Sequence, residues 1–130
     1  FRYRGSNLEG CVALSATVGL VPGDPERIRA LMEEYRAQRR ARQPQTGRSA
    51  GCVFKNPPGT SAGRLIDQAG LKGLAVGDAQ VSTVHGNFLV NRGHATPAQF
   101  AELMALVRER VWAIHGIELE PEVEIWGRGL

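Results

Sequence analysis

The sequence has few of the features that mark exported, membrane-bound or metal-binding proteins. Its two cysteines, Cys11 and Cys52, lie far apart without Cys-x-x-Cys spacing, and its three histidines are equally scattered. These spacings predict neither a disulfide framework nor a metal site. No apolar run approaches the ~20 residues that a membrane span needs, and the first residues contain no apolar block typical of a signal peptide. We therefore expect neither export nor membrane insertion.

Length and composition indicate one globular domain. The chain has 130 residues, of which 42% are hydrophobic, so it is long enough to bury a sizeable core. Its net charge of +3 is modest. Few aromatic residues lie near the basic cluster to stack on bases, so the cluster favours a solvated helix end or a site for one phosphorylated small molecule over nucleic acid. The cluster contains five arginines: Arg36, Arg39, Arg40, Arg42 and Arg48.

Two patterns occupy the first third of the chain. Alternating apolar residues between Cys11 and Val21 predict a β-strand with one apolar face. Asp24 and Pro25 then supply a helix N-cap and a proline at the first helical position. Apolar residues at helical spacing extend this predicted helix to about Ala41. These residues are Ile28, Leu31, Met32 and Tyr35.

Helix signals recur in the rest of the chain. A Pro-Pro-Gly turn at 57–59 precedes a short predicted helix at 61–69, which Gly70 ends. A capping box begins at Thr96, and an apolar stripe extends that predicted helix to His115. Both helices should therefore have well-defined ends.

Strand signals lie between and after these helices. Predicted strands at 81–84 and 87–91 are joined around His85, and alternation of apolar and glutamate residues predicts a last strand at 117–125. Pro121 suggests an edge or a bulge in that strand. The mixed order without repeated βαβ units indicates an α+β fold, a small mixed or antiparallel sheet packed against two or three helices.

The greatest density of reactive groups lies at residues 49–57. Small residues and Gly51 allow a ligand to approach the backbone, and a thiol, an ammonium and an amide follow at Cys52, Lys55 and Asn56. The same residues are also consistent with a short buried strand that begins at Cys52 and enters a turn, since free cysteine is often buried. The residues alone leave both interpretations open.

This segment resembles the active-site motif of the UDP-N-acetylenolpyruvoylglucosamine reductases, flavoenzymes of peptidoglycan precursor synthesis. The common form of the motif is Ser-Ala-Gly-Ser-Val-Phe-Lys-Asn-Pro, so Cys52 stands in place of a serine. Residues 1–6 resemble the family's Tyr-Arg-x-Ser segment, and residues 119–123 resemble its closing Glu-Pro-Glu-Val. The three matches follow the family's order and together span essentially the whole chain.

The resemblance implies a cytoplasmic enzyme that uses FAD and NADPH to reduce UDP-N-acetylglucosamine enolpyruvate to UDP-N-acetylmuramate. In that family the reduced flavin gives hydride to the enolpyruvyl double bond, and the residue in the place of Cys52 protonates the adjacent carbon. Arg4 and Glu122 match the pair that stabilises the enolate, a role suited to charge-assisted hydrogen bonds. The implied cofactor-contacting residues are Gly51 and Cys52. The implied substrate-binding residues are Tyr3, Arg39, Arg42, Lys55 and Asn56.

The cysteine in place of serine leaves two roles open. A free thiol has a pKa of about 8.5, so at neutral pH it is mostly protonated and is a better acid than an alcohol. A thiol beside the cationic Lys55 could instead ionise and act as a nucleophile. The motif contains no histidine to activate a nucleophile, which favours Cys52 as a proton donor.

The resemblance also implies a division of the chain and a set of partners. The family's flavin-binding part precedes the Tyr-Arg-x-Ser segment, so this chain would be a C-terminal fragment of about half an enzyme. Residues 1–18 would end the flavin-binding domain and form the crossover strand, and residues 19–130 would form the substrate-binding domain. The short connection at 21–24 matches the family type that lacks an extra substrate-covering loop. The implied partners are the UDP-linked substrate and the N-terminal FAD-binding domain, in a monomer.

An interpretation from another class also stays open. In it the chain is a non-enzymatic α+β module whose Arg39, Arg42 and Lys55 hold a phosphorylated ligand or an acidic partner. Flavin-binding glycine loops upstream of this sequence in the parent gene would favour the reductase, and their absence would favour the module.

Overall fold

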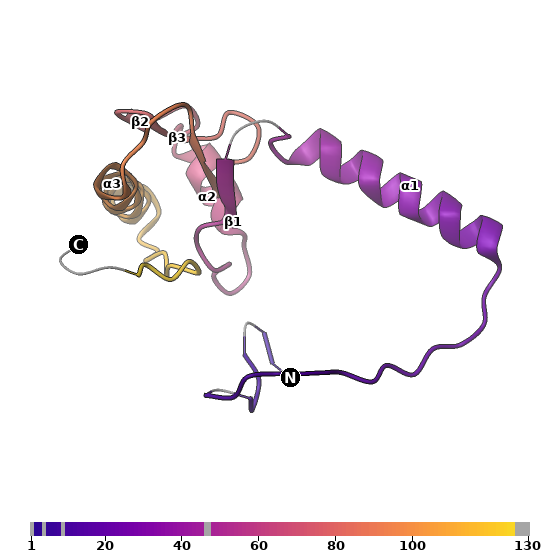
Figure 1. The fold of residues 1–130 in the computed structure, drawn as a ribbon. Coiled ribbons are helices and arrows are strands. Elements are labelled where there is room, and N and C mark those ends of the chain that lie inside the picture. The colour runs from indigo at the N-terminus through magenta and orange to yellow at the C-terminus, as the bar shows by residue number, and fades with distance from the viewer. Residues whose placement is uncertain (1, 4, 9, 46–47, 127–130) are drawn as a thin grey trace. The chain divides into compact units, whose positions relative to one another are not determined.

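The computed structural model describes residues 2–3, 5–8, 10–45 and 48–126 of the chain (Figure 1). These residues fall into two compact units, Phe1–Glu33 and Glu34–Leu130. Helix α1 (Pro25–Arg42) begins in the first unit and ends in the second. The remaining helices and strands of the described residues all belong to the second unit.

The segment that precedes α1 does not form the predicted strand. Residues 11–24 have no regular secondary structure, and the apolar side chains of the alternating pattern are exposed. A strand requires a neighbour for its backbone hydrogen bonds, and within the described part of the chain no strand pairs with this segment. The strand prediction is therefore wrong for this chain by itself. The exposed residues are Val12, Leu14, Val18, Leu20 and Val21.

Helix α1 begins and ends close to the predicted residues. The Asp24 carboxylate accepts a hydrogen bond of 2.9 Å from the Glu26 backbone N–H, as an N-cap does. Basic side chains occupy the last turn, where the helix dipole favours positive charge. None of the residues of α1, all of which the structure describes, is buried. Local signals therefore define this helix, and its predicted apolar face is not covered.

The second unit contains a four-stranded antiparallel sheet with the order β1-β4-β3-β2. The strands are β1 (Arg48–Cys52), β2 (Ala75–Val76), β3 (Ala79–Val81) and β4 (Phe88–Asn91). The strands predicted at 81–84 and 87–91 correspond to β3 and β4 with shifted ends. Residues 82–87 instead form the connection, because the Ser82 hydroxyl accepts the backbone N–H groups of Val84 and His85.

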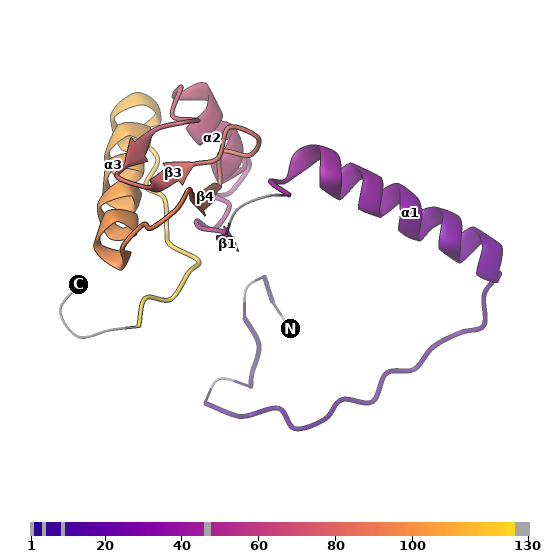
Figure 2. The same ribbon diagram turned by 45° about the horizontal axis from the view of Figure 1, so that its top comes forward.

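Two helices pack with the sheet to form the core (Figure 2). Helix α2 (Ala62–Gln68) is capped by Ser61, and helix α3 (Pro97–His115) has the predicted capping box at Thr96. Gly116 ends α3 in the left-handed conformation, with φ of 64°. The α+β prediction is confirmed. The core includes Leu65 and Ile66 from α2, Leu103, Met104, Val107 and Val111 from α3, and Ala79, Val81 and Leu89 from the sheet.

The C-terminal segment is not the strand predicted at 117–125. It makes one isolated antiparallel bridge, between Pro121 and Phe54, and it buries Leu119 in the core. Pro121 has no N–H group to donate, so a continuous ladder is interrupted at this residue. The segment nevertheless lies against the residues that follow β1.

Candidate functional site in the segment after β1

The backbone of β1 is distorted next to Cys52. Ser49 pairs with Val90 but Cys52 pairs with Phe88, so β1 contains one more residue than β4 over this stretch. This is a β-bulge, and Gly51 within it has φ of +91°, a conformation that favours glycine. A bulge redirects the side chains that follow it. Cys52 and Phe88, as paired residues, therefore project from the same face of the sheet.

The backbone of the three residues after Cys52 is hydrogen-bonded along both edges. On one edge, the Val53 N–H donates to the Asn87 carbonyl at 2.9 Å. On the other edge, the Glu122 N–H donates to the Val53 carbonyl at 2.7 Å, and the Lys55 N–H donates to the Glu120 carbonyl at 2.8 Å. The segment therefore lies between the start of β4 and the C-terminal residues.

This arrangement brings two predicted catalytic residues onto neighbouring backbone segments. The hydrogen bond between Val53 and Glu122 joins the residue directly after Cys52 to Glu122 itself. Both side chains are half-buried, and the Oε2 atom of Glu122 is inaccessible to water. Their predicted partner Arg4 lies outside the described residues. The joint catalytic role of the three side chains thus stays a prediction.

Lys55 and Asn56 have partners within the second unit. The Lys55 ammonium forms an ion pair with Glu120, one of the glutamates of the predicted last strand. The Glu120 side chain is largely exposed, and such a pair stabilises the fold by less than about 1 kcal/mol. The side-chain oxygen of Asn56 accepts the Ala62 N–H at 3.1 Å, at the beginning of α2. Asn56 therefore links the motif to that helix.

The remaining predicted substrate-binding residues belong to α1 and to the first unit. Arg39 and Arg42 are exposed in the last turns of α1, and the Arg39 guanidinium donates to the Gln43 side chain at 3.1 Å. Tyr3 is exposed in a turn of the first unit, closed by two backbone hydrogen bonds between Arg2 and Gly5. The assignment of these three residues to the substrate stays a prediction.

Sequence reasoning missed Asn87 and His85. Asn87 is 2% exposed, and its side chain binds the Phe54 backbone. Asn87 was assigned to a strand, although a polar amide within an apolar segment needs buried partners and was a usable signal. His85 accepts the Asn87 N–H through Nδ1 at 3.1 Å and packs edge-on against Phe88. Burial, and secondarily the charge of Lys72, hold the pKa of His85 below its ordinary value.

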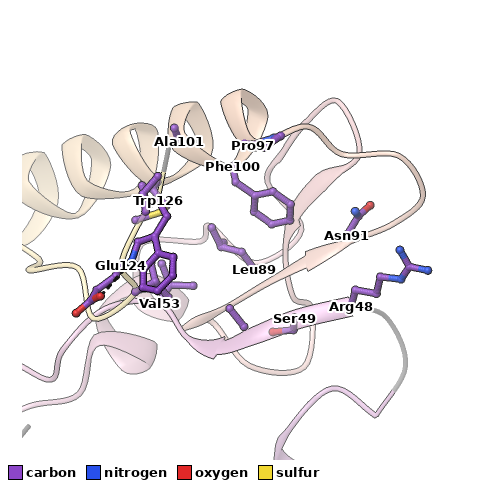
Figure 3. A pocket seen from close by; sticks show the side chains of 14 residues that line it. Arg48, Ser49, Val53, Leu89, Asn91, Pro97, Phe100, Ala101, Glu124 and Trp126 are labelled. Carbon is purple, nitrogen blue, oxygen red and sulfur yellow. Dashed lines mark hydrogen bonds between the residues drawn. The ribbon is translucent and has the colours of Figure 1, made fainter. Parts of the chain in front are cut away.

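A pocket of about 500 Å³ lies between α3 and the sheet (Figure 3). Leu89 and Phe100 project into it, Arg48 and Asn91 lie at one end, and Trp126 lies at the other. Among the described residues that line it, the predicted site residues do not appear. Three other residues of the motif, Ser49, Ala50 and Val53, nevertheless line the pocket on either side of Gly51 and Cys52.

Two other features are absent from the described ranges. No group of three or more histidine, cysteine, aspartate or glutamate side chains there is arranged to hold a metal ion. None of the described helices combines the length and the apolar character that crossing a bilayer requires. Neither Cys11 nor Cys52 forms a disulfide.

The fold and the side chains of the second unit first indicate a class of protein. The second unit is an α+β domain that carries a thiol, an ammonium and carboxylates on two adjoining segments, 52–56 and 120–122. Such a domain can contribute acid–base groups to a larger active site. Residues 43–126 match the family model for the C-terminal domain of UDP-N-acetylenolpyruvoylglucosamine reductase. The chain belongs to this family.

Curated relatives and a solved structure agree with this assignment. The chain is 50% identical to UDP-N-acetylenolpyruvoylglucosamine reductase 2 of Symbiobacterium thermophilum over 98% of its own length and 42% of the relative's. It is 48% identical to the reductase of Moorella thermoacetica over 100% of its length and 43% of that protein's. The crystal structure of the Thermus caldophilus reductase superposes with a TM-score of 0.66 at 50% identity, covering 78% of this chain and 35% of that one. The chain thus spans about two fifths of the length of these curated relatives.

Proposed function

We propose that this chain is the substrate-binding C-terminal part of an FAD- and NADPH-dependent reductase that converts UDP-N-acetylglucosamine enolpyruvate to UDP-N-acetylmuramate. The enzyme acts in the cytoplasm, as a monomer, in peptidoglycan precursor synthesis. The observation that carries the proposal is the backbone hydrogen bond between Val53 and Glu122, within a chain about 50% identical to named reductases. It joins the segments that hold Cys52 and Glu122. The names of these relatives support the reductase over a non-enzymatic binding module.

The residues of the bulge fit a flavin on one side. A Cβ atom added to Gly51 would meet nothing within 4 Å, so the backbone there is open to a flat ring. We assign Gly51 and Cys52 to this contact, and the other flavin-binding residues to the part of the reductase that lies outside this chain. When bound, the reduced flavin supplies hydride to the carbon–carbon double bond of the enolpyruvyl group.

The residues of this chain then donate the proton and stabilise the negative charge that develops on the substrate. The Cys52 thiol donates its proton to the carbon next to the one that receives hydride. Arg4 holds the substrate carboxylate, where negative charge develops, by charge-assisted hydrogen bonds. Glu122 stabilises the same charge as a protonated donor or orients its neighbours. Lys55 and Asn56 bind the substrate beside them.

The UDP portion of the substrate is assigned to other residues. Arg42, with Arg39 as second choice, binds the diphosphate from the end of α1, and Tyr3 contacts the substrate from the first unit. Phosphate oxygens are recognised best by donors of this kind. The exposure of Arg42 leaves its guanidinium accessible to a ligand, which supports the assignment.

The exposed apolar residues of 11–21 support the division of the chain. We infer that residues 1–18 complete the flavin-binding domain and that its sheet supplies the neighbour which the 11–21 segment needs. Residues 19–130 then form the substrate-binding domain.

A single-turnover experiment on the full-length enzyme tests the proposal. NADPH should bleach the flavin absorbance, and addition of UDP-N-acetylglucosamine enolpyruvate without oxygen should restore it. A flavin that stays reduced after the substrate is added would refute the assigned reaction. Restoration by the enolpyruvyl substrate but not by UDP-N-acetylglucosamine is the expected result.

A further inference from the structure

We propose that Asn87 is a positioning residue that holds the Cys52 segment in its reactive geometry. The proposal rests on the proposed function, because it concerns the thiol to which we assign proton transfer. Asn87 itself lies outside the active-site motif and directly precedes β4, the strand that pairs with β1. It acts through the backbone of Val53 and Phe54.

Asn87 makes three hydrogen bonds to two consecutive residues. Its side-chain oxygen accepts the Phe54 N–H at 2.9 Å, and its side-chain NH₂ donates to the Phe54 carbonyl at 2.8 Å. Its own carbonyl accepts the Val53 N–H at 2.9 Å. The side chain therefore pairs with Phe54 as a neighbouring strand would, at the point where the ladder between β1 and β4 ends.

The position of this contact explains why it should control Cys52. Gly51 lies before Cys52 in a bulge, so the ladder between β1 and β4 is interrupted on that side of Cys52. The Asn87 contacts begin one residue after Cys52 and restrain the chain there. The same two residues carry the hydrogen bond to Glu122 and the bridge to Pro121. Asn87 thus supports the backbone that joins the thiol segment to the carboxylate segment.

Because the contact between Asn87 and Phe54 is buried, it requires a side chain that both donates and accepts a hydrogen bond, as an amide does. Asn87 and Phe54 are both almost fully buried, so neither backbone group of Phe54 can turn to water if the side chain is removed. Aspartate has the same shape but lacks the NH₂ donor while it is ionised. Protonated aspartate regains a donor and restores both hydrogen bonds. This difference provides a test that a loss of stability alone would not imitate.

The experiment compares Asn87→Ala and Asn87→Asp in the full-length reductase by single-turnover absorbance. Flavin reduction by NADPH does not use Cys52 and should keep its rate. Flavin reoxidation by UDP-N-acetylglucosamine enolpyruvate should slow roughly 10- to 100-fold in the alanine variant at every pH, as misplaced reacting groups do. The aspartate variant should be equally slow at high pH and approach the parental rate as the pH falls. Burial raises the pKa of such a carboxyl, which brings this recovery toward the neutral range.

The matched control is Thr96→Ala, which removes the cap of α3 and should leave both half-reactions unchanged. Rates are divided by those of the parent at each pH. This division removes the pH effects that the parent shares with the variants. The titratable groups on the segments packed around Asn87 are His85, Cys52, Lys55, Glu120 and Glu122.

Two outcomes would overturn the proposal. One is an Asn87→Ala variant whose reoxidation rate equals the parental rate, or whose two half-reactions slow equally. The other is an Asn87→Asp variant with the parental pH profile, which decides the question even if the alanine variant does not fold. Cys52→Ala and the parent are measured alongside. If the parent itself shows no reoxidation, the proposed function fails; if it does and only the Asn87 variants are unaffected, the positioning role alone fails.

Discussion

Residues 11–21 and strand β4 are both rich in apolar residues, yet they end in different environments. Leu14 is 93% exposed, whereas Leu89 of β4 is 3% exposed. β4 lies between β1 and β3 and has a hydrogen-bonding neighbour on each side. The 11–21 segment has no such neighbour among the described residues. An apolar pattern thus predicts which surface is suited to burial, and the available partner decides whether it is buried.

The largest effect is expected from removing the proton donor that we assign to the second unit. That unit has its own core, but on our proposal it holds only part of an active site. Cys52→Ala in the full-length reductase should slow flavin reoxidation by the enolpyruvyl substrate by about 10²- to 10⁴-fold, because the general acid is lost. Flavin reduction by NADPH should not change. Cys52→Ser should keep substantial activity, since a hydroxyl also carries a proton, and a parental rate in the alanine variant would exclude Cys52 as the donor.

A pair of leucine substitutions tests the contrast in burial directly. Leu103→Ala, at a position 0% exposed in the core, should lower the free energy of unfolding of this chain by about 2–5 kcal/mol. Leu14→Ala in the same chain should change it by less than about 0.5 kcal/mol, because its side chain is already in water. Urea denaturation followed by circular dichroism measures both.

The same leucine pair in the full-length reductase sharpens the result. There Leu14→Ala should also destabilise the protein, because the flavin-binding domain would cover residue 14. A Leu14 substitution that stays neutral in the full-length enzyme would contradict the proposed partner of the 11–21 segment.

Helix α1 provides an intermediate case, since it belongs to both units and buries none of its described residues. Arg42→Ala in the full-length enzyme should raise the KM for the UDP-linked substrate about 10- to 100-fold, as loss of a charge-assisted hydrogen bond does. Flavin reduction by NADPH should be affected less. Arg40→Ala is the control, because we expect Arg40 to be solvated. An unchanged KM with lowered stability would assign Arg42 to the fold.

The smallest expected effect concerns His85 in the second unit. Its pKa in the folded chain lies below the ordinary value of 6.5, chiefly because of burial. The unfolded chain therefore binds more protons just below pH 6.5, so the stability is fully present above that pH and decreases as the pH falls toward the folded pKa. His85→Asn keeps an acceptor for the Asn87 N–H and should flatten this dependence.

Melting temperatures of this chain between pH 5 and pH 8 would measure the His85 effect. Parent and His85→Asn curves with the same slope would show that His85 does not couple to folding.

Local signals predicted the parts of the second unit that depend on neighbours in the sequence. The cap at Thr96 and the stop at Gly116 are complete within a few residues, so both ends of α3 were predictable. The end of the chain could not be predicted in the same way. Pro121 forms a bridge with Phe54, which lies far away in the sequence, and interrupts the ladder there. The strand ends near Ser82 were wrong for a similar reason, since the hydroxyl of Ser82 competes for backbone N–H groups.

The candidate site divides in the same way. The reactive residue types of the motif at 49–57 were evident from the sequence, and the resemblance to the reductase family gave them their predicted roles. The bulge at Gly51 and the contacts of Asn87 could not be predicted, because both depend on the register between β1 and β4. The pairing of Lys55 with Glu120 likewise joins residues that no local pattern relates.

The sequence by itself determined the ends of the helices, the class of fold and the reactive groups of the motif, because each depends on side chains and backbone preferences within a few positions. Tertiary structure alone decided which apolar faces are covered and that Glu122 lies beside Val53. Hydrogen bonds between residues distant in the sequence depend on register, and register is set only when the elements pack.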